Sequence, residues 1–84
     1  MPEPLANQWC ATDGVHIDVR GLPPPEPMVA ILTLLENPVT GDPVIIHHDR
    51  EPVYLYPELV ERGWKYEIIV GEPGEVRLLL TRQT

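Results

Sequence analysis

The sequence is short of cysteine and of positive charge, and both shortages limit what the protein is expected to do. Cys10 is the only cysteine among 84 residues, so no disulfide can form within one chain. Six lysines and arginines stand against 13 aspartates and glutamates, which gives a formal net charge of −7. This balance repels phosphate groups, so we expect neither a nucleic-acid partner nor a membrane partner.

Long apolar runs and a leader-like segment are also missing. No stretch approaches the roughly 20 apolar residues of a membrane-spanning helix, and the chain does not open with a charged and then apolar segment typical of secretory signals. We therefore expect a cytoplasmic protein. Its length allows one domain with one modest core.

Proline, by contrast, is abundant, and four of the 11 prolines lie in one short segment. Residues 21–27 read Gly-Leu-Pro-Pro-Pro-Glu-Pro, and we call this segment the proline loop. Because proline fixes φ and has no backbone N–H, the loop is excluded from a helix or strand interior. It predicts a rigid connection from a strand into a helix, where Pro25 or Pro27 in the first turn costs no hydrogen bond.

Apolar alternation predicts four strands in a single domain over residues 15–84. The expected strands are residues 15–19, a continuously apolar central strand at 44–48, and two alternating segments at 64–70 and 76–80 joined by a hairpin at 71–74. Residues 1–14 have no clean period and are predicted to be an N-terminal tail, with Trp9 packed against the domain and a turn at Asp13-Gly14.

Helical spacing predicts two helices. The first has an apolar stripe at Met28, Ile31, Leu32 and Leu35, and it leaves Val29, Ala30 and Thr33 on the opposite face.

The second helix is expected before Gly63, with inward positions at Val53, Tyr56, Leu59 and Val60. It starts either at Pro52 or at Pro57, because a residue before proline is pushed away from helical geometry. The element order predicts an α+β two-layer sandwich, with a four-stranded mixed sheet and both helices on one face.

Residues 18–27, Asp-Val-Arg-Gly-Leu-Pro-Pro-Pro-Glu-Pro, resemble the signature of the TusA/SirA-like sulfur-carrier superfamily. In that signature Gly-Leu is followed, after one residue, by Cys-Pro-x-Pro. The element order is also similar, as are the joint Asp-Arg-Glu-Pro at 49–52 and Gly63-Trp64, where the family often has Gly-His. The resemblance spans residues 15–82 and implies a β-α-β-α-β-β fold of the TusA/SirA type.

The sequence departs from this family at the residue that carries sulfur, because Pro24 stands where the family has its cysteine. A persulfide relay needs a thiolate at a helix N-terminus, and Cys10 lies well upstream of the predicted helix. The chain therefore resembles the cysteine-less, uncharacterised branch of the superfamily, a domain of unknown function. Members of that branch share the Leu-Pro-Pro-Pro and His-Asp-x-x-Pro segments, and some are fused to hemerythrin-like domains.

Three residues are candidate ligands for a metal, a haem or a small molecule. His48 and Asp49 end the central strand, on the side where open α/β sheets place their sites, and His16 lies on the first strand. The alternative is that His48 and Asp49 cap or orient the following turn. His47 and His48 are not expected to share an ion, because adjacent strand residues point to opposite faces.

The proline loop is the candidate surface for a ligand or a partner. Its residues are Gly21, Leu22, Pro23, Pro24, Pro25, Glu26 and Pro27, with Arg20 just before it. Arg20 either holds an anion near the helix start or forms a surface ion pair with Asp18 or Glu26.

No motif for a specific reaction is found, since a Ser-His-Asp spacing, a phosphate-binding glycine loop and a paired zinc-ligand motif are all absent. The sequence requires no cofactor. We expect a small non-catalytic accessory module of bacterial redox or sulfur metabolism that docks on a protein partner. The second hypothesis is a metal-, haem- or small-ligand-binding domain that uses His48 and Asp49, and the third is a sulfur-relay protein that uses Cys10.

Overall fold

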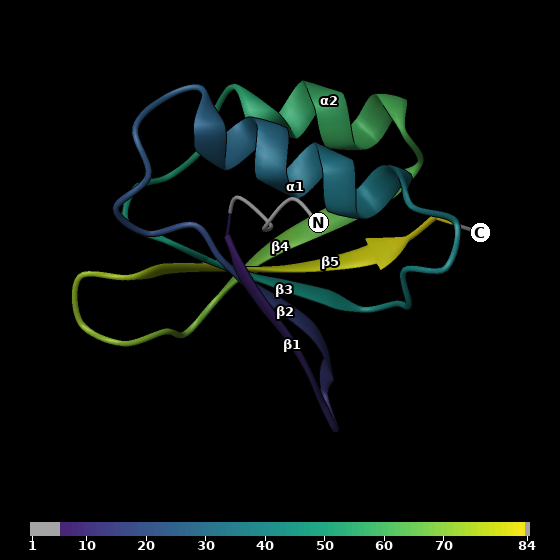
Figure 1. Ribbon diagram of the computed structural model, residues 1–84, viewed down its shortest axis with the longest axis horizontal. Helices are drawn as coiled ribbons and strands as arrows, with labels where there is room; N and C mark the ends of the chain where they lie inside the picture. Colours follow the sequence, from purple (N-terminus) through teal and green to yellow (C-terminus); the bar gives the residue numbers. More distant parts are fainter. Residues whose placement is uncertain (1–5, 84) are drawn as a thin grey trace, which may run out of the picture.

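The computed structural model describes residues 6–83, which form five strands and two helices (Figure 1). In chain order these are β1 (Asn7–Ala11), β2 (Gly14–Asp18), α1 (Glu26–Glu36), β3 (Val44–His48), α2 (Leu55–Glu61), β4 (Trp64–Ile69) and β5 (Val76–Arg82). Within this range, neither helix has the length and apolar composition needed to cross a membrane.

One mixed sheet forms the first layer and the two helices form the second, on a single face of the sheet (Figure 1). The strand order is β1-β2-β3-β5-β4. β2 and β3 run parallel, and the other neighbouring pairs are antiparallel. β3 is central, as predicted, and all five of its residues are buried. The predicted α+β arrangement of two helices on a mixed sheet is confirmed.

The predicted number of four strands is wrong, because residues 7–11 of the expected tail form the edge strand β1. β1 pairs with β2 and sets Trp9 opposite His16. All five of its residues are exposed, so neither face is buried in the core, and its sequence Asn-Gln-Trp-Cys-Ala has no apolar alternation that marks a strand. Residues 1–5 of the expected tail lie outside the described residues.

The turn expected at Asp13-Gly14 does connect β1 to β2. Gly14 has φ +138°, and a Cβ at this position would collide with the carbonyl oxygen of Pro43. Glycine is therefore needed for the turn to lie against the start of β3.

The core lies between the sheet and the helices, and most elements contribute to it. Its largest fully buried side chains are Ile17 and Val19 from β2 and its end, Ile31 from α1, Val44 and Ile46 from β3, Leu55 and Leu59 from α2, Trp64 from β4, and Leu78 and Leu80 from β5. The strand residues among them are those that the alternation places on one face. Full burial of such a side chain contributes about 1.5–3 kcal/mol.

The buried stripe of α1 is rotated slightly from the predicted one. It comprises Pro27, Ala30, Ile31, Leu34 and Leu35, while Met28 and Leu32 are only partly buried. The prediction that Ala30 faces outward is therefore wrong. The observed stripe has the regular spacing i, i+3, i+4, i+7 and i+8, which starts one residue before the predicted stripe.

Helix α2 begins at Leu55, between the two predicted starts. Pro57 is its third residue, within the first turn, where the missing N–H has no intrahelical acceptor to lose. The predicted inward positions of Val53 and Val60 are wrong, since these side chains are 53% and 59% exposed. Val53 precedes the helix, and a helix that begins at Leu55 turns Leu55 and Leu59 toward the core instead.

Candidate functional site

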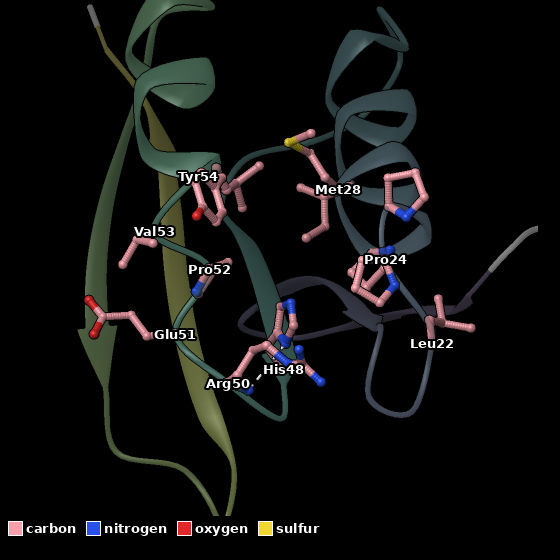
Figure 2. A pocket seen from close by; sticks show the side chains of 13 residues that line it. Leu22, Pro24, Met28, His48, Arg50, Glu51, Pro52, Val53 and Tyr54 are labelled. Carbon is pink, nitrogen blue, oxygen red and sulfur yellow. Dashed lines mark hydrogen bonds between the residues drawn. The ribbon is translucent and has the colours of Figure 1, made fainter.

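A pocket of about 320 Å³ opens between the start of α1 and the segment that leads into α2 (Figure 2). The proline loop and α1 form one wall, and residues 50–55 form the other. The lining is largely apolar and comprises Leu22, Pro24, Pro25, Pro27, Met28, Ile31, His48, Arg50, Glu51, Pro52, Val53, Tyr54 and Leu55. The structure thus brings the predicted proline-loop surface and His48 together around one cavity.

His48 is the buried polar residue of this pocket, and its ring lies between the two walls (Figure 2). The backbone N–H groups of Asp49 and Arg50 both donate to Nδ1, at 2.9 and 3.3 Å. Nδ1 also lies 3.1 Å from Oδ1 of Asp49, a contact that would need a proton on Nδ1. The two backbone donors need a lone pair there instead, and we assign the proton of the neutral ring to Nε2 on this ground. Burial disfavours the imidazolium and lowers the pKa of His48 below its ordinary value, although the Asp49 carboxylate opposes this effect.

The hydrogen bonds of His48 among residues 6–83 all involve Nδ1, and none involves Nε2. Because no buried side-chain nitrogen or oxygen in these residues lacks a partner, Nε2 is accessible from the pocket. The side chain as a whole is only 5% exposed. A donor on a buried ring, surrounded by apolar walls, is available to an acceptor that enters the pocket.

Asp49 connects the two walls of the pocket at the end of β3. Its Oδ2 accepts a hydrogen bond from the backbone N–H of Gly21, at 3.1 Å, and this contact lowers the pKa of the carboxyl. Asp49 therefore ties the proline loop to the turn after β3. His48 and Asp49 both orient the turn after β3, which is the alternative role suggested by the sequence. Nε2 of His48 takes no part in these contacts.

Arg20 forms an ion pair with Asp18, and its Nη1 lies 3.7 Å from Oε2 of Glu75. Nε and Nη2 of Arg20 donate to the two carboxylate oxygens of Asp18, at 2.9 and 2.8 Å. These hydrogen bonds lower the pKa of Asp18 and raise that of Arg20. Of the two ion pairs expected for Arg20, the pair with Asp18 is the one present in the described residues.

The opposite face of the sheet carries a second polar cluster, which the sequence did not predict. His16 and His47 lie on adjacent parallel strands, and Nδ1 of His16 is 2.8 Å from Nε2 of His47. Nε2 of His16 is 2.7 Å from Asp13, and Nδ1 of His47 is 2.8 Å from Glu75. The side chains form a continuous row, Asp13–His16–His47–Glu75, which we call the imidazole row.

The protons of the imidazole row can be counted from these contacts. Each carboxylate accepts an N–H from its own imidazole, which uses one proton on His16 and one on His47. The two remaining ring nitrogens face each other, so one of them must donate. All three contacts are hydrogen bonds together only when the two rings carry three protons between them, as an imidazole–imidazolium pair.

Trp9 of β1 covers the imidazole pair. Its ring lies nearly parallel to His16 and to His47, with centroids 5.0 and 5.4 Å away. The two imidazoles are 5.0 Å apart at an angle of 19°, and with their 2.8 Å N···N contact this is an edge-to-edge and nearly coplanar arrangement. Trp9 therefore packs against the domain, as predicted, and a cation in the pair would face an aromatic ring.

Glu75 anchors the far end of the imidazole row, with a side chain only 2% exposed. Burial raises the pKa of its carboxyl, but hydrogen bonds from His47 and from the backbone N–H of Glu72, together with the charge of Arg77, outweigh burial and hold the pKa below its ordinary value. Arg77 donates to the carboxylate from Nε at 2.9 Å. The carboxylate is therefore ionised and fully engaged.

The three candidate metal ligands do not converge. His16 lies on the same face as His47, whereas His48 points to the helix side of the sheet. No group of three or more histidine, cysteine, aspartate or glutamate side chains in residues 6–83 is arranged to hold a metal ion. Cys10 is exposed on β1 opposite Val15, near the start of β2, whereas the proline loop follows the end of β2.

Comparison with known proteins identifies a family. No curated protein and no solved structure matches the chain significantly. The family model DUF2249, described as an uncharacterized conserved protein, matches residues 16–82. The match includes the proline loop, His16, His47, His48 and Glu75, and it starts after β1. Because it covers most of the sequence, the chain belongs to the DUF2249 family of uncharacterized conserved proteins.

Proposed function

We propose that this domain binds a small, mainly apolar molecule with one hydrogen-bond acceptor, in the pocket between the proline loop and residues 50–55. The observation that carries the proposal is Nε2 of His48, which has no hydrogen-bond partner among the described residues and is accessible from a cavity with a largely apolar lining. Binding sites for small molecules have this composition, with mostly apolar walls and a few polar groups that set orientation.

The donor is preorganised for this role. Two backbone N–H groups fix the ring of His48 through Nδ1, so the direction of Nε2–H does not have to be ordered on binding. Asp49 holds the proline loop, which is part of the first wall, through the backbone N–H of Gly21. The prolines that line the first wall restrict its backbone further.

The chemistry of the anchor indicates the class of ligand. A neutral imidazole with its proton on Nε2 donates and does not accept, so the ligand needs a carbonyl or carboxylate oxygen and not an ammonium. Arg50 lies beside His48 at the mouth of the pocket and favours a carboxylate (Figure 2). The volume of about 320 Å³ is at the lower end of the range for small-molecule sites.

The test compares octanoate, octanamide and octylammonium, which share an alkyl chain and differ in the head group, by backbone-amide chemical shifts and titration. We expect octanoate and octanamide to bind and octylammonium to bind much more weakly. Long-range attraction by the net charge of −7 favours the opposite order. Equal or tighter binding of octylammonium would therefore refute the role of His48.

Variants locate the site. His48→Asn keeps an acceptor for the turn amides and removes Nε2–H, so octanamide should bind roughly 2- to 12-fold more weakly. Met28→Trp should fill the pocket and abolish binding, whereas Val29→Trp, on the exposed side of the same helix, should leave it unchanged. Binding that survives Met28→Trp would place the ligand elsewhere.

Docking on a protein partner is the second candidate function. It is supported by Tyr54, which is strongly exposed at the rim of the pocket, and by the exposed Pro23, Pro24 and Pro25 of the facing proline loop.

We also infer kinship in fold with sulfur carriers, because the proline loop opens α1 where that superfamily places its cysteine. A sulfur relay is the third hypothesis, and the position of Cys10 away from the loop gives it little support.

A further inference from the structure

Strand β4 forms an edge of the sheet and leaves one side of its backbone without a partner strand among the described residues. It is the last strand in the order β1-β2-β3-β5-β4 and pairs only with β5. Four consecutive residues, Lys65, Tyr66, Glu67 and Ile68, are exposed. Such an edge is a template for a further strand.

The exposed side chains of β4 are divided between the two faces of the sheet. Tyr66 and Ile68 are on the helix side, 40% and 56% exposed, and Tyr66 stacks on Tyr56 of α2 with ring centroids 4.1 Å apart. Lys65 and Glu67 alternate with them and therefore lie on the opposite face. One face of the edge is thus apolar and aromatic, and the other has one charge of each sign.

The side chains of β4 are complementary to those of a second, antiparallel β4 strand. In an antiparallel pair of β4 strands related by a two-fold axis at Tyr66, Lys65 of each copy lies opposite Glu67 of the other. The same register sets Tyr66 opposite Tyr66 and Ile68 opposite Trp64 on the apolar face. Directly opposed side chains of opposite charge, and opposed aromatic or β-branched side chains, stabilise strand pairs.

The neighbouring symmetric registers lack this complementarity. A two-fold axis at Lys65 sets two lysines opposite each other, and an axis at Glu67 sets two glutamates opposite each other. Like charges directly opposite are destabilising. Among these three registers the charges of β4 favour the one centred on Tyr66, in which the strand is complementary to a second copy of this chain.

We propose that the protein forms a symmetric homodimer in which two β4 strands pair antiparallel around Tyr66 and join the two sheets into one. The arrangement is isologous, so it closes at two copies and does not lead to a filament. The proposed pairing uses backbone and side chains of β4, none of which lines the pocket, so the dimer does not require the ligand proposed above.

Charge exchange in the full-length chain tests the proposal, with mass measured by light scattering and dissociation constants by sedimentation at about 0.15 M salt. Lys65→Glu alone and Glu67→Lys alone each convert two attractive pairs into two repulsive ones. We expect each to raise the dimer dissociation constant on the order of tenfold. The double variant Lys65→Glu/Glu67→Lys should return to the original value.

A mixture of the two single variants gives the sharpest result. The chain with two glutamates and the chain with two lysines should form a heterodimer, although each dimerises poorly alone. A variant that had merely lost its fold would not be rescued by mixing. Failure of both the double variant and the mixture to restore dimers would refute the register.

A disulfide scan then locates the axis. In a Cys10→Ser background, Tyr66→Cys should form a disulfide-linked dimer on mild oxidation, because residue 66 meets itself, whereas Lys65→Cys should form much less. A chain that stays monomeric at about 1 mM would overturn the proposal, since any association would then be weaker than millimolar. Dimers that are insensitive to β4 variants would assign the contact to another surface.

Discussion

At the scale of single residues, His16 and His47 are the most consequential pair outside the pocket. Their shared hydrogen bond joins two parallel strands, and the outer nitrogens of both rings are held by carboxylates. Buried polar groups of this kind stabilise a fold only when every member has a partner. The loss of one imidazole therefore leaves the other, buried imidazole without its partner, whereas Asp13 is exposed to solvent and Glu75 keeps its hydrogen bonds from Glu72 and Arg77.

We predict that His16→Ala and His47→Ala each lower the free energy of unfolding by about 1–3 kcal/mol, because each leaves a buried imidazole without its partner. The double variant should lose less than the sum of the two, with a coupling of about 0.5–3 kcal/mol. Urea denaturation at constant pH measures all three values. Gln8→Ala, an exposed neighbour of Trp9, should change stability by no more than about 0.5 kcal/mol. Additive effects of the two histidine variants would show that the imidazoles stabilise the protein independently.

At the scale of secondary-structure elements, the start of α2 at Leu55 determines which of its side chains are buried. Leu59 is fully buried and the adjacent Val60 is 59% exposed. Leu59→Ala should lower the free energy of unfolding by about 2–5 kcal/mol through the lost contacts and the cavity. Val60→Ala should change it by less than about 0.5 kcal/mol. Comparable losses for both variants would mean that α2 is rotated relative to the core.

The elements differ in how well the sequence predicts them, and burial is the physical reason. β2, β3, β4 and β5 each have a face in the core, so apolar periodicity marks them. β1 has no buried residue and left no such mark. The start of α2 depends on the path of residues 50–54 between the end of β3 and the helix. The spacing of apolar residues within this segment does not predict that path.

The same reasoning applies to the sites. The sequence predicted His48 and the proline loop as candidates, since both stand at element boundaries with unusual composition. The pocket between them depends on the packing of residues 21–27 against residues 50–55, which are far apart in the sequence, and no local pattern predicts its volume. The imidazole row needs the parallel register of β2 with β3, and also Glu75 from a distant hairpin. Asp13, His16 and His47 alone were not enough to predict it.

At the scale of the whole molecule, four groups with lowered pKa values make stability depend on pH in the same direction. The pKa values of Asp18, Asp49 and Glu75 are lowered in the folded protein, so their contribution is present above their ordinary values and is lost as the pH falls below about 4. His48 acts at higher pH, because its ordinary pKa is 6.5 and the folded value is lower. Between the folded and the unfolded pKa of His48, the unfolded chain binds more protons at this residue than the folded protein does.

The contribution of His48 to the free energy of unfolding should therefore fall as the pH falls below 6.5, and this contribution should be absent in a variant without the imidazole. We predict that the stability of the unmodified chain relative to His48→Asn is constant above about pH 7.5 and declines toward pH 5. Urea denaturation across this range measures the difference, and groups common to both chains cancel. A relative stability that is flat or rises on acidification would contradict a buried, neutral His48.

The edge position of β1 also affects how protons of the imidazole row exchange with solvent. β1 pairs with β2 alone and buries none of its five residues. An element with so few buried contacts detaches by local unfolding at a free energy well below that of the global transition. Each detachment lifts Trp9 from His16 and His47. The fraying of one strand therefore sets the rate at which solvent hydrogen reaches the shared proton, while the core of the domain stays folded.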